Sequence, residues 1–189
     1  IQMGDKPSQS IRGGKNSSMW NSIESVKSSK AEVAISCGNT GSLMAISTLL
    51  LRKLPEVKRP AIAIFWPSTS NQGFNVVLDA GADIKAQPSD LLAYSNFGSD
   101  IFSKVFNTRK VKVGLLNVGT ETHKGNEQLR KASELFIETF ENGEIEYVGF
   151  VEGSDFSSAK ANVIVTDGFS GNIALKTAEG TANLIKKFF

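Results

Sequence analysis

The residues that could do chemistry gather in short polar turns that contain glycine. One turn follows the apolar run 111–116 and contains these residues: Gly119, Thr120, Glu121, Lys124, Gly125 and Asn126. The turns 37–42 and 166–172 have a similar mixture of glycine, asparagine and hydroxyl side chains. Such turns leave backbone N–H groups free to bind an anion, and Lys124 adds a positive charge. This set is typical of a site that binds phosphate and polarises a carbonyl group by electrostatic stabilisation.

The sequence lacks the residue patterns of other common catalytic sites. It has one histidine, His123, and one cysteine, Cys37, and its carboxylates are not spaced as metal ligands. It contains no Gly-x-Ser-x-Gly elbow, no Walker A sequence and no Gly-x-Gly-x-x-Gly fingerprint. A lone cysteine at a strand end is usually buried by packing, so we expect Cys37 in the core rather than as a nucleophile. Asp79 could orient a lysine, bind a metal or cap a turn.

Alternating strands and helices must position these turns. Besides the run that starts at Val111, apolar and β-branched runs predict strands at 31–36, 61–66, 74–78, 145–151 and 163–165. Helical spacing predicts helices at 18–30 after a cap at Ser17 or Ser18, at 42–51, from Ser89 to 106, at 127–140, and from Ile173 to the chain end. Residues 1–10 indicate a strand end and a turn.

This alternation predicts an α/β fold with a mostly parallel sheet and helices on both faces. The turn 67–73 is short enough for a hairpin, which adds a short antiparallel pair. Ligands bind at the carboxyl ends of the strands in such sheets, so we expect the polar turns to converge on one cleft.

The overall composition is that of an ordinary globular protein. Its 189 residues, 40% of them hydrophobic, predict a single α/β catalytic domain, 1–189. A net charge of +2 does not favour nucleic acid as a partner, and one cysteine excludes an internal disulfide. The longest apolar run is too short to span a bilayer. The chain begins at Ile1 and stops within a helical pattern, so we expect a fragment truncated at both ends.

Four motifs in order resemble the bacterial phosphate acyltransferase (PlsX) family of phospholipid synthesis. They are Cys-Gly-Asn-Thr-Gly at 37–41, Leu-Asp-Ala-Gly-Ala at 78–82, Asn-Val-Gly-Thr-Glu at 117–121 with Lys-Gly-Asn-Glu at 124–127, and Thr-Asp-Gly-Phe-Ser-Gly-Asn at 166–172. The segments 15–19 and 175–180 also resemble the family. The similarity covers nearly the whole chain.

The resemblance implies a fold like that of isopropylmalate dehydrogenase and phosphotransacetylase. It implies that acyl-[acyl-carrier protein] and inorganic phosphate react to give acyl phosphate and free carrier protein, with no organic cofactor and no metal. Members of this family are homodimers in the cytoplasm and associate peripherally with the inner face of the membrane.

The resemblance also implies roles for individual residues. The expected catalytic residues are Lys124, Asn172, Asn39 and Thr40. The expected phosphate- and substrate-binding residues are Gly38, Gly41, Asp79, Gly81, Gly119, Thr120, Glu121, Gly125, Asn126, Asp167, Gly168 and Gly171. Carrier proteins are acidic as a class, so the candidate docking residues are Arg12, Lys15, Lys27 and Lys30.

In this scheme phosphate lies among the amides of 38–41 and 168–171. Lys124 reduces its repulsion toward the thioester, and Asn172 or a loop amide holds the developing oxyanion. Asp167 and Glu121 orient their partners rather than act as bases.

The chain departs from the family pattern in a few places. Asp83 stands where the family usually has Asn, Ser154 where it has Arg, and Gly14 with Lys15 where it has a basic pair. The N-terminal Asp-Ala-Met-Gly-Gly-Asp motif is missing. Two alternatives remain open. One is an NAD(P)-linked dehydrogenase of the related fold, which needs a nucleotide site and aspartates spaced Asp-x-x-x-Asp, a spacing that the predicted helices lack. The other, favoured by the truncation and by these departures, is a non-catalytic module that binds carrier protein or an anion.

Overall fold

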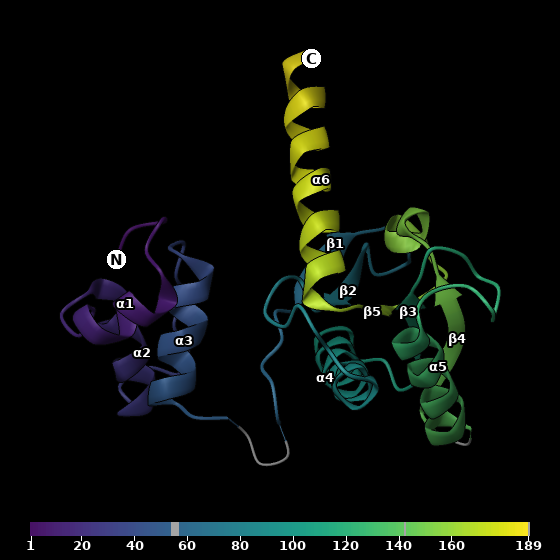
Figure 1. Ribbon diagram of the computed structural model, residues 1–189, viewed down its shortest axis with the longest axis horizontal. Coiled ribbons are helices and arrows are strands. Elements are labelled where there is room, and N and C mark those ends of the chain that lie inside the picture. The colour runs from purple at the N-terminus through teal and green to yellow at the C-terminus, as the bar shows by residue number, and fades with distance from the viewer. Residues whose placement is uncertain (54–56, 142, 189) are drawn as a thin grey trace. The chain divides into compact units, whose positions relative to one another are not determined.

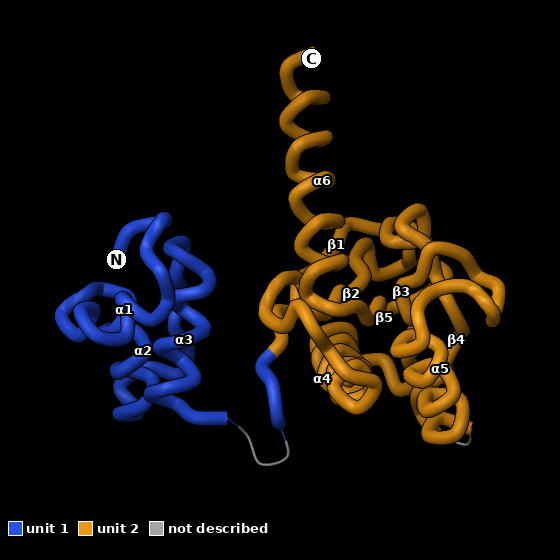
Figure 2. Tube along the Cα trace, viewed as in Figure 1, with its two compact units in different colours: residues 1–60 blue, residues 61–189 orange. Residues whose placement is uncertain are grey.

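The computed structural model describes residues 1–53, 57–141 and 143–188. The chain divides into two compact units, Ile1–Pro60 and Ala61–Phe189, which Figure 2 colours separately. We describe each unit by itself. Whether the two act as one catalytic domain remains a prediction.

The described residues of unit 1 form three helices: α1 (Pro7–Gly13), α2 (Ser18–Lys27) and α3 (Thr40–Leu50). Its small core contains Met19, Ile23 and Ile46. The expected cap of α2 is confirmed, since Ser17 Oγ accepts a hydrogen bond from Trp20 N at 3.2 Å. Helix α1 replaces the expected turn within residues 1–10, because Pro7 at its first position is preset for helical geometry.

The strand expected at 31–36 is wrong. These residues have no regular structure and pair with none of the strands in the described parts of the chain. Val33 and Ile35 are 69% and 83% exposed, so the alternation that suggested a strand has no sheet to bury it. Cys37 follows this segment and is exposed. The expectation that Cys37 lies in the core, at the end of a strand, is therefore also wrong.

Unit 2 is built on a sheet that, within the described residues, has five strands in the order β1-β2-β5-β3-β4. Their bounds are β1 (Ile64–Pro67), β2 (Phe74–Leu78), β3 (Val111–Leu116), β4 (Ile145–Val151) and β5 (Val163–Val165). β2, β5, β3 and β4 run parallel, and β1 pairs antiparallel with β2. The expected α/β fold with one antiparallel hairpin is confirmed.

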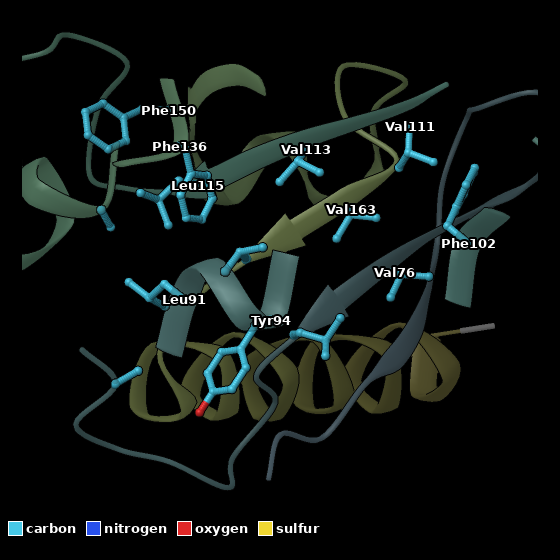
Figure 3. Close-up of a cluster of buried hydrophobic side chains, with 14 residues drawn as sticks. Val76, Leu91, Tyr94, Phe102, Val111, Val113, Leu115, Phe136, Phe150 and Val163 are labelled. Carbon is cyan, nitrogen blue, oxygen red and sulfur yellow. The ribbon is translucent and has the colours of Figure 1, made fainter. Parts of the chain in front are cut away.

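Helices lie on both faces of this sheet (Figure 1). α4 (Pro88–Phe106) and α5 (Glu127–Phe140) cover one face. The larger core lies there and includes Val113, Val163 and Tyr94 (Figure 3). The opposite face packs Val77 and Ile164 against the 3-10 helix η1 (Gly153–Ser157) and the first turns of α6 (Gly168–Phe188). Alternate residues of each strand serve opposite faces, as the pleat requires.

Three expected helix starts need correction. α3 begins at Thr40 rather than at Ser42, because Asn39 Oδ1 accepts from Ser42 N at 2.9 Å and caps the helix. α4 begins at Pro88, and its cap is Gln87 rather than Ser89, because Asp90 Oδ2 accepts from Gln87 N at 3.0 Å. α6 begins at Gly168 rather than at Ile173. The Asp167 carboxylate accepts from Ser170 N at 2.9 Å and therefore caps the helix five residues earlier than expected. In the described residues no helix is long and apolar enough to cross a bilayer.

Candidate active site

The parallel strands place four chain segments at one edge of the sheet. The segments that follow β2, β3, β4 and β5 start at Asp79, Asn117, Glu152 and Thr166. Because parallel strands share their carboxyl edge, these segments lie where open α/β sheets bind ligands. Three of the expected polar turns, those after β2, β3 and β5, therefore lie at one edge of the sheet, whereas the turn 37–42 belongs to unit 1 and follows no strand.

Asp79 shapes the segment after β2. Its side chain is fully buried, and its two oxygens accept from the N–H groups of Ile62, Gly81, Ala82 and Asp83 at 2.6–3.0 Å. These backbone donors leave little capacity for a substrate. We therefore regard Asp79 as a residue that positions the loop.

The first turn of α6 packs directly on this loop. A Cβ on Gly168 would lie 2.7 Å from Asp79 Oδ2, and one on Gly171 would overlap the Asp79 carbonyl oxygen. Gly81 has φ +137° and backs onto the Asn172 amide, which donates to the Ala80 carbonyl at 3.4 Å. The glycines of this motif are therefore needed for close packing between helix and loop.

The N–H groups in this turn are largely used within the protein. Gly168 N donates to the Asp83 carbonyl at 2.8 Å, and Gly171 N donates to the Asp167 carbonyl at 3.0 Å. Ser170 N is bound by the Asp167 side chain. The Asn172 side chain is exposed and held by one long hydrogen bond, so it remains available to a ligand.

The turn after β3 holds Lys124 in an ion pair. Lys124 Nζ lies 2.9 Å from Glu121 Oε1, and both side chains are about half exposed. Hydrogen bonding to Glu121 raises the pKa of Lys124, and it lowers the pKa of Glu121. Gly119 is buried against this pair, since a Cβ there would lie 2.9 Å from Lys124 Nζ. Thr120 next to it is exposed.

Asn117 fixes the shape of this turn, and the sequence analysis missed that role. Its Nδ2 donates to the Lys124 carbonyl at 3.1 Å, and its Oδ1 accepts from Val118 N at 2.8 Å. Gly125 has φ +84° and faces the Asn117 amide, so a side chain there would be strained. Asn126 caps α5 by accepting from Leu129 N at 2.9 Å. The signal available in the sequence was an asparagine directly after an apolar strand, and the structure shows that Asn117 is buried.

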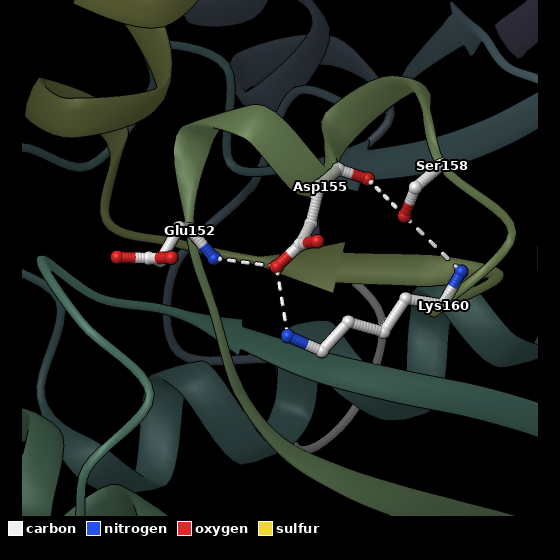
Figure 4. A network of polar contacts seen from close by, with 4 residues as sticks. All are labelled: Glu152, Asp155, Ser158 and Lys160. Atoms are coloured by element: carbon white, nitrogen blue, oxygen red, sulfur yellow. Dashed lines mark hydrogen bonds and ion pairs between the residues drawn. The ribbon is translucent and has the colours of Figure 1, made fainter.

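The segment after β4 is held by a polar network around Asp155 (Figure 4). Asp155 Oδ2 accepts from Lys160 Nζ at 2.8 Å and from Glu152 N at 3.0 Å. Burial raises the pKa of Asp155, whereas these two donors together lower it by more, so the pKa lies below its ordinary value. The network fixes Glu152, whose charge also helps to raise the pKa of Lys124.

A cavity of ≈ 410 Å³ opens among the starts of α4, α5 and α6. Its polar lining consists of Lys85, Gln87, Asn126, Gln128, Asp167 and Ser170. Asn126 and Asp167 were expected in the site, whereas Lys85, Gln87 and Gln128 were missed. Lys85 and Gln87 lie at the end of the loop that leads from β2 into α4, and Gln128 lies in the first turn of α5. In open α/β sheets such segments border the ligand site, and this rule could have found them.

The remaining expected residues lie in unit 1. Asn39 caps α3 through Ser42 N, and its Nδ2 donates to the carbonyls of Gln2, Met3 and Asp5. Its side chain therefore holds the N-terminal segment in place. The others at this helix start are Gly38, Thr40 and Gly41, and the exposed basic residues are Arg12, Lys15, Lys27 and Lys30.

The departures from the family pattern have different structural settings. Gly14 is buried, and a Cβ there would overlap the Ser10 carbonyl oxygen, so a basic residue would need this turn to move. Ser154 is exposed in η1. Asp83 is buried and accepts from Tyr94 Oη at 3.3 Å. Burial, with the nearby Asp83 charge, raises the pKa of Tyr94. In the described residues no group of three or more His, Cys, Asp or Glu side chains could hold a metal ion.

The architecture is that of the phosphotransacetylases. The chain is similar to a phosphotransacetylase from Streptococcus pyogenes, with a TM-score of 0.60 and 18% identity over 86% of this chain and 54% of the other. A phosphotransacetylase from Staphylococcus aureus gives a TM-score of 0.59 and 18% identity over 87% and 56%. At this identity the likeness establishes the fold alone.

Sequence similarity then identifies the family. The family described as "Fatty acid synthesis protein" matches residues 1–189, and this chain belongs to it. "Phosphate acyltransferase" of Paracoccus denitrificans is 56% identical over 98% of this chain and 50% of its own length. The protein of the same name from Dinoroseobacter shibae is 54% identical over 100% and 49%. The expected family is confirmed, and the chain spans about half the length of these curated relatives.

Proposed function

We propose that this protein is a phosphate acyltransferase that moves the acyl group of an acyl-[acyl-carrier protein] to inorganic phosphate. The observation that carries the proposal is the 56% identity, over nearly the whole chain, to a protein named phosphate acyltransferase. In the reaction a phosphate oxygen bonds to the acyl carbon, the carbon–sulfur bond breaks, and the carrier's thiol leaves as thiolate.

The turn after β3 supports an electrostatic role for Lys124. A lysine is protonated at neutral pH, and Glu121 holds the Lys124 ammonium at the carboxyl edge of the sheet. An ammonium there offsets the repulsion between phosphate and the developing oxyanion. Asn172 suits the second role, since its amide is exposed and can donate to that oxyanion.

The internal hydrogen bonds of the α6 turn remove several of its N–H groups from the proposed phosphate site. The N–H groups of Gly168, Ser170 and Gly171 already have acceptors, so they stabilise the helix start. We propose that phosphate is held mainly by Lys124 and by the polar side chains of the cavity at the starts of α4, α5 and α6. The phosphate contacts expected for Thr40 and for the amides of 38–41 remain a prediction.

A phosphate titration followed by backbone NMR tests that arrangement. Shifts of 117–126 and of the cavity residues 84–87 at the same phosphate concentration are expected. Shifts confined to one of these two segments would contradict the arrangement.

Trapping with hydroxylamine tests the activity itself. The protein is supplied with acyl-[acyl-carrier protein] and phosphate, and acyl hydroxamate is measured, with the Paracoccus denitrificans relative assayed in parallel. Phosphate-dependent hydroxamate is the expected result. Turnover linked to NAD(P) would favour a dehydrogenase, and binding of carrier protein without turnover would favour a non-catalytic module.

We also propose a homodimer located in the cytoplasm and bound peripherally to the inner face of the membrane, as the family resemblance implies. Sedimentation equilibrium and co-sedimentation with anionic vesicles measure the two properties. A monomer at micromolar concentration, or no vesicle binding, would contradict the respective part.

A further inference from the structure

An apolar groove runs beside α6 on the sheet face opposite to α4 and α5. Its volume is ≈ 560 Å³, and nothing in the proposed reaction has used it so far. Figure 1 shows α6 continuing well beyond the sheet, so the helix forms a long wall on one side. The other side is formed by the end of β1 and by η1.

The α6 wall is hollow because its side chains are small. Ala174, Ala178 and Ala182 line the groove at intervals of four residues, and Ile185 stands near its far end. Residues four apart lie on the same helix face, so the three alanines form one continuous furrow. From Ala174 to Ile185 the helix rises about 16 Å, which suits an extended hydrocarbon chain.

The opposite wall is a fixed pair of aromatic rings. The centroids of Trp66 and Phe156 are 4.8 Å apart, and Trp66 Nε1 donates to Ser157 Oγ at 3.1 Å. Phe156 is 3% exposed and belongs to the core. This hydrogen bond satisfies the polar atom of the indole, so the ring presents an apolar surface to the groove.

One end of the groove adjoins the candidate site. Ala174 follows Asn172 by two residues on α6, and Gly153, which also lines the groove, follows Glu152. Asn172 is the proposed oxyanion donor, and the Glu152 charge acts on Lys124. A thioester carbonyl near these residues could extend its acyl chain directly into the groove.

We propose that this groove binds the acyl chain of the substrate and that Ala178 limits how much chain it accepts. The inference rests on the proposed acyltransferase function. Its volume and its mostly apolar lining are those of small-molecule sites, which typically measure about 300–1,000 Å³. Its concave, narrow form between a helix and two rings fits a flexible chain of methylene groups.

Filling the groove tests this proposal in the active protein. Ala178→Phe places a ring in the furrow, and Asn183→Phe, an exposed position of the same helix outside the groove, is the control. With Ala178→Phe, turnover of palmitoyl-carrier protein should fall at least about tenfold and that of octanoyl-carrier protein less than about twofold, because removing room for several methylenes changes rates by such factors. Asn183→Phe should change neither. Equal losses for both chain lengths, or no loss, would overturn the proposal.

A binding measurement separates this proposal from the proposed function. The protein has two tryptophans, so Trp20→Phe leaves Trp66 as the fluorescent group. A palmitic acid brominated along its chain should quench Trp66, and Ala178→Phe should abolish the quenching while Asn183→Phe leaves it. Quenching without any acyl phosphate production would support the acyl-chain groove and contradict the proposed acyltransferase function. Acyl phosphate production without quenching would support the function and contradict the groove. If Ala178→Phe instead turns a dimer into a monomer and keeps the chain-length preference, the groove is an interface between copies and the proposal fails.

Discussion

At the scale of single residues, Lys124 is the position on which the proposed chemistry depends most. Lys124→Ala should lower acyl phosphate formation by about 10²–10³, because one electrostatic donor to a transition state is typically worth that much. The fold should remain intact, since the Lys124 side chain is exposed and its ion-pair partner Glu121 is exposed as well.

Lys131→Ala is the matched control. Lys131 forms a similar exposed pair on α5, with Nζ 2.6 Å from Glu127 Oε1. Hydroxamate assays and circular dichroism on both variants provide the comparison. Near wild-type activity of Lys124→Ala, or an equal loss in both variants, would remove Lys124 from the mechanism.

The neighbour of Lys124 sets the pH at which its charge is lost. Hydrogen bonding to Glu121 raises the pKa of Lys124, so the ammonium is retained to higher pH and is lost as pH rises through that raised value. Glu121→Gln removes the charge, and the alkaline limb of the pH–rate profile should move to lower pH. Glu134→Gln on α5 is the control. An alkaline limb that does not move would show that Lys124 does not control it.

At the scale of elements, the close contact between α6 and the Asp79 loop makes a sharp prediction. Gly171→Ala places a Cβ against the Asp79 carbonyl oxygen and should destabilise the protein by about 1–3 kcal/mol, the usual cost of overpacking. Gly180 lies on the same helix with open space around it, so Gly180→Ala should stabilise by up to about 1 kcal/mol. Chemical denaturation measures both. Equal effects would mean that α6 does not pack on this loop in solution.

The exposed basic residues of unit 1 make a second prediction at this scale. If they dock the acidic carrier protein, Lys15→Glu and Lys27→Glu should each slow association, and the remaining affinity should depend less on salt. Lys104→Glu on α4 is the control. Stopped-flow association at two salt concentrations measures the effect, and rates unchanged by the unit 1 variants would refute this docking surface.

The sequence was most informative where local chemistry and packing agree. The bounds of α5, β4 and β5 match the prediction, because an asparagine cap or a buried apolar run marks them clearly. The prediction failed for 31–36, where β-branched residues have no sheet to join, since pairing is a tertiary property. It missed the early start of α6, because two glycines and polar residues in that turn resemble a loop unless Asp167 is recognised as its cap.

The candidate site was foreseen as a set of turns but not as a set of contacts. Sequence position indicated that Lys124, Asn126 and Asp167 follow strands. It could not reveal that Asp79 is saturated by backbone N–H groups, or that Lys85 and Gln128 line a cavity. Those properties depend on which segments meet across the sheet edge.

At the scale of the whole molecule, the chain consists of two units and spans about half the length of the curated relatives that it matches. The polar turns of unit 2 meet at one sheet edge, and Asn39 and Thr40 belong to the other unit. We predict that a variant that weakens only unit 1 lowers activity while unit 2 keeps its packing.

The burial of Tyr94 against Asp83 gives the protein a built-in optical reporter. The chain has two tyrosines, and burial raises the pKa of both, that of Tyr147 to about 12. An unfolded tyrosine ionises near its ordinary pKa of about 10, so stability should decline as pH rises above that value.

Phenolate absorbance should therefore appear together with the loss of circular dichroism in an alkaline titration, and both changes should occur above pH 10. Tyr94→Phe should halve the change in ultraviolet absorbance, and the remaining change should still coincide with the loss of circular dichroism. Ionisation that precedes the loss of structure would show that these rings are open to water. If ionisation and the loss of structure coincide, the ultraviolet spectrum alone reports whether the sheet that supports the site is folded.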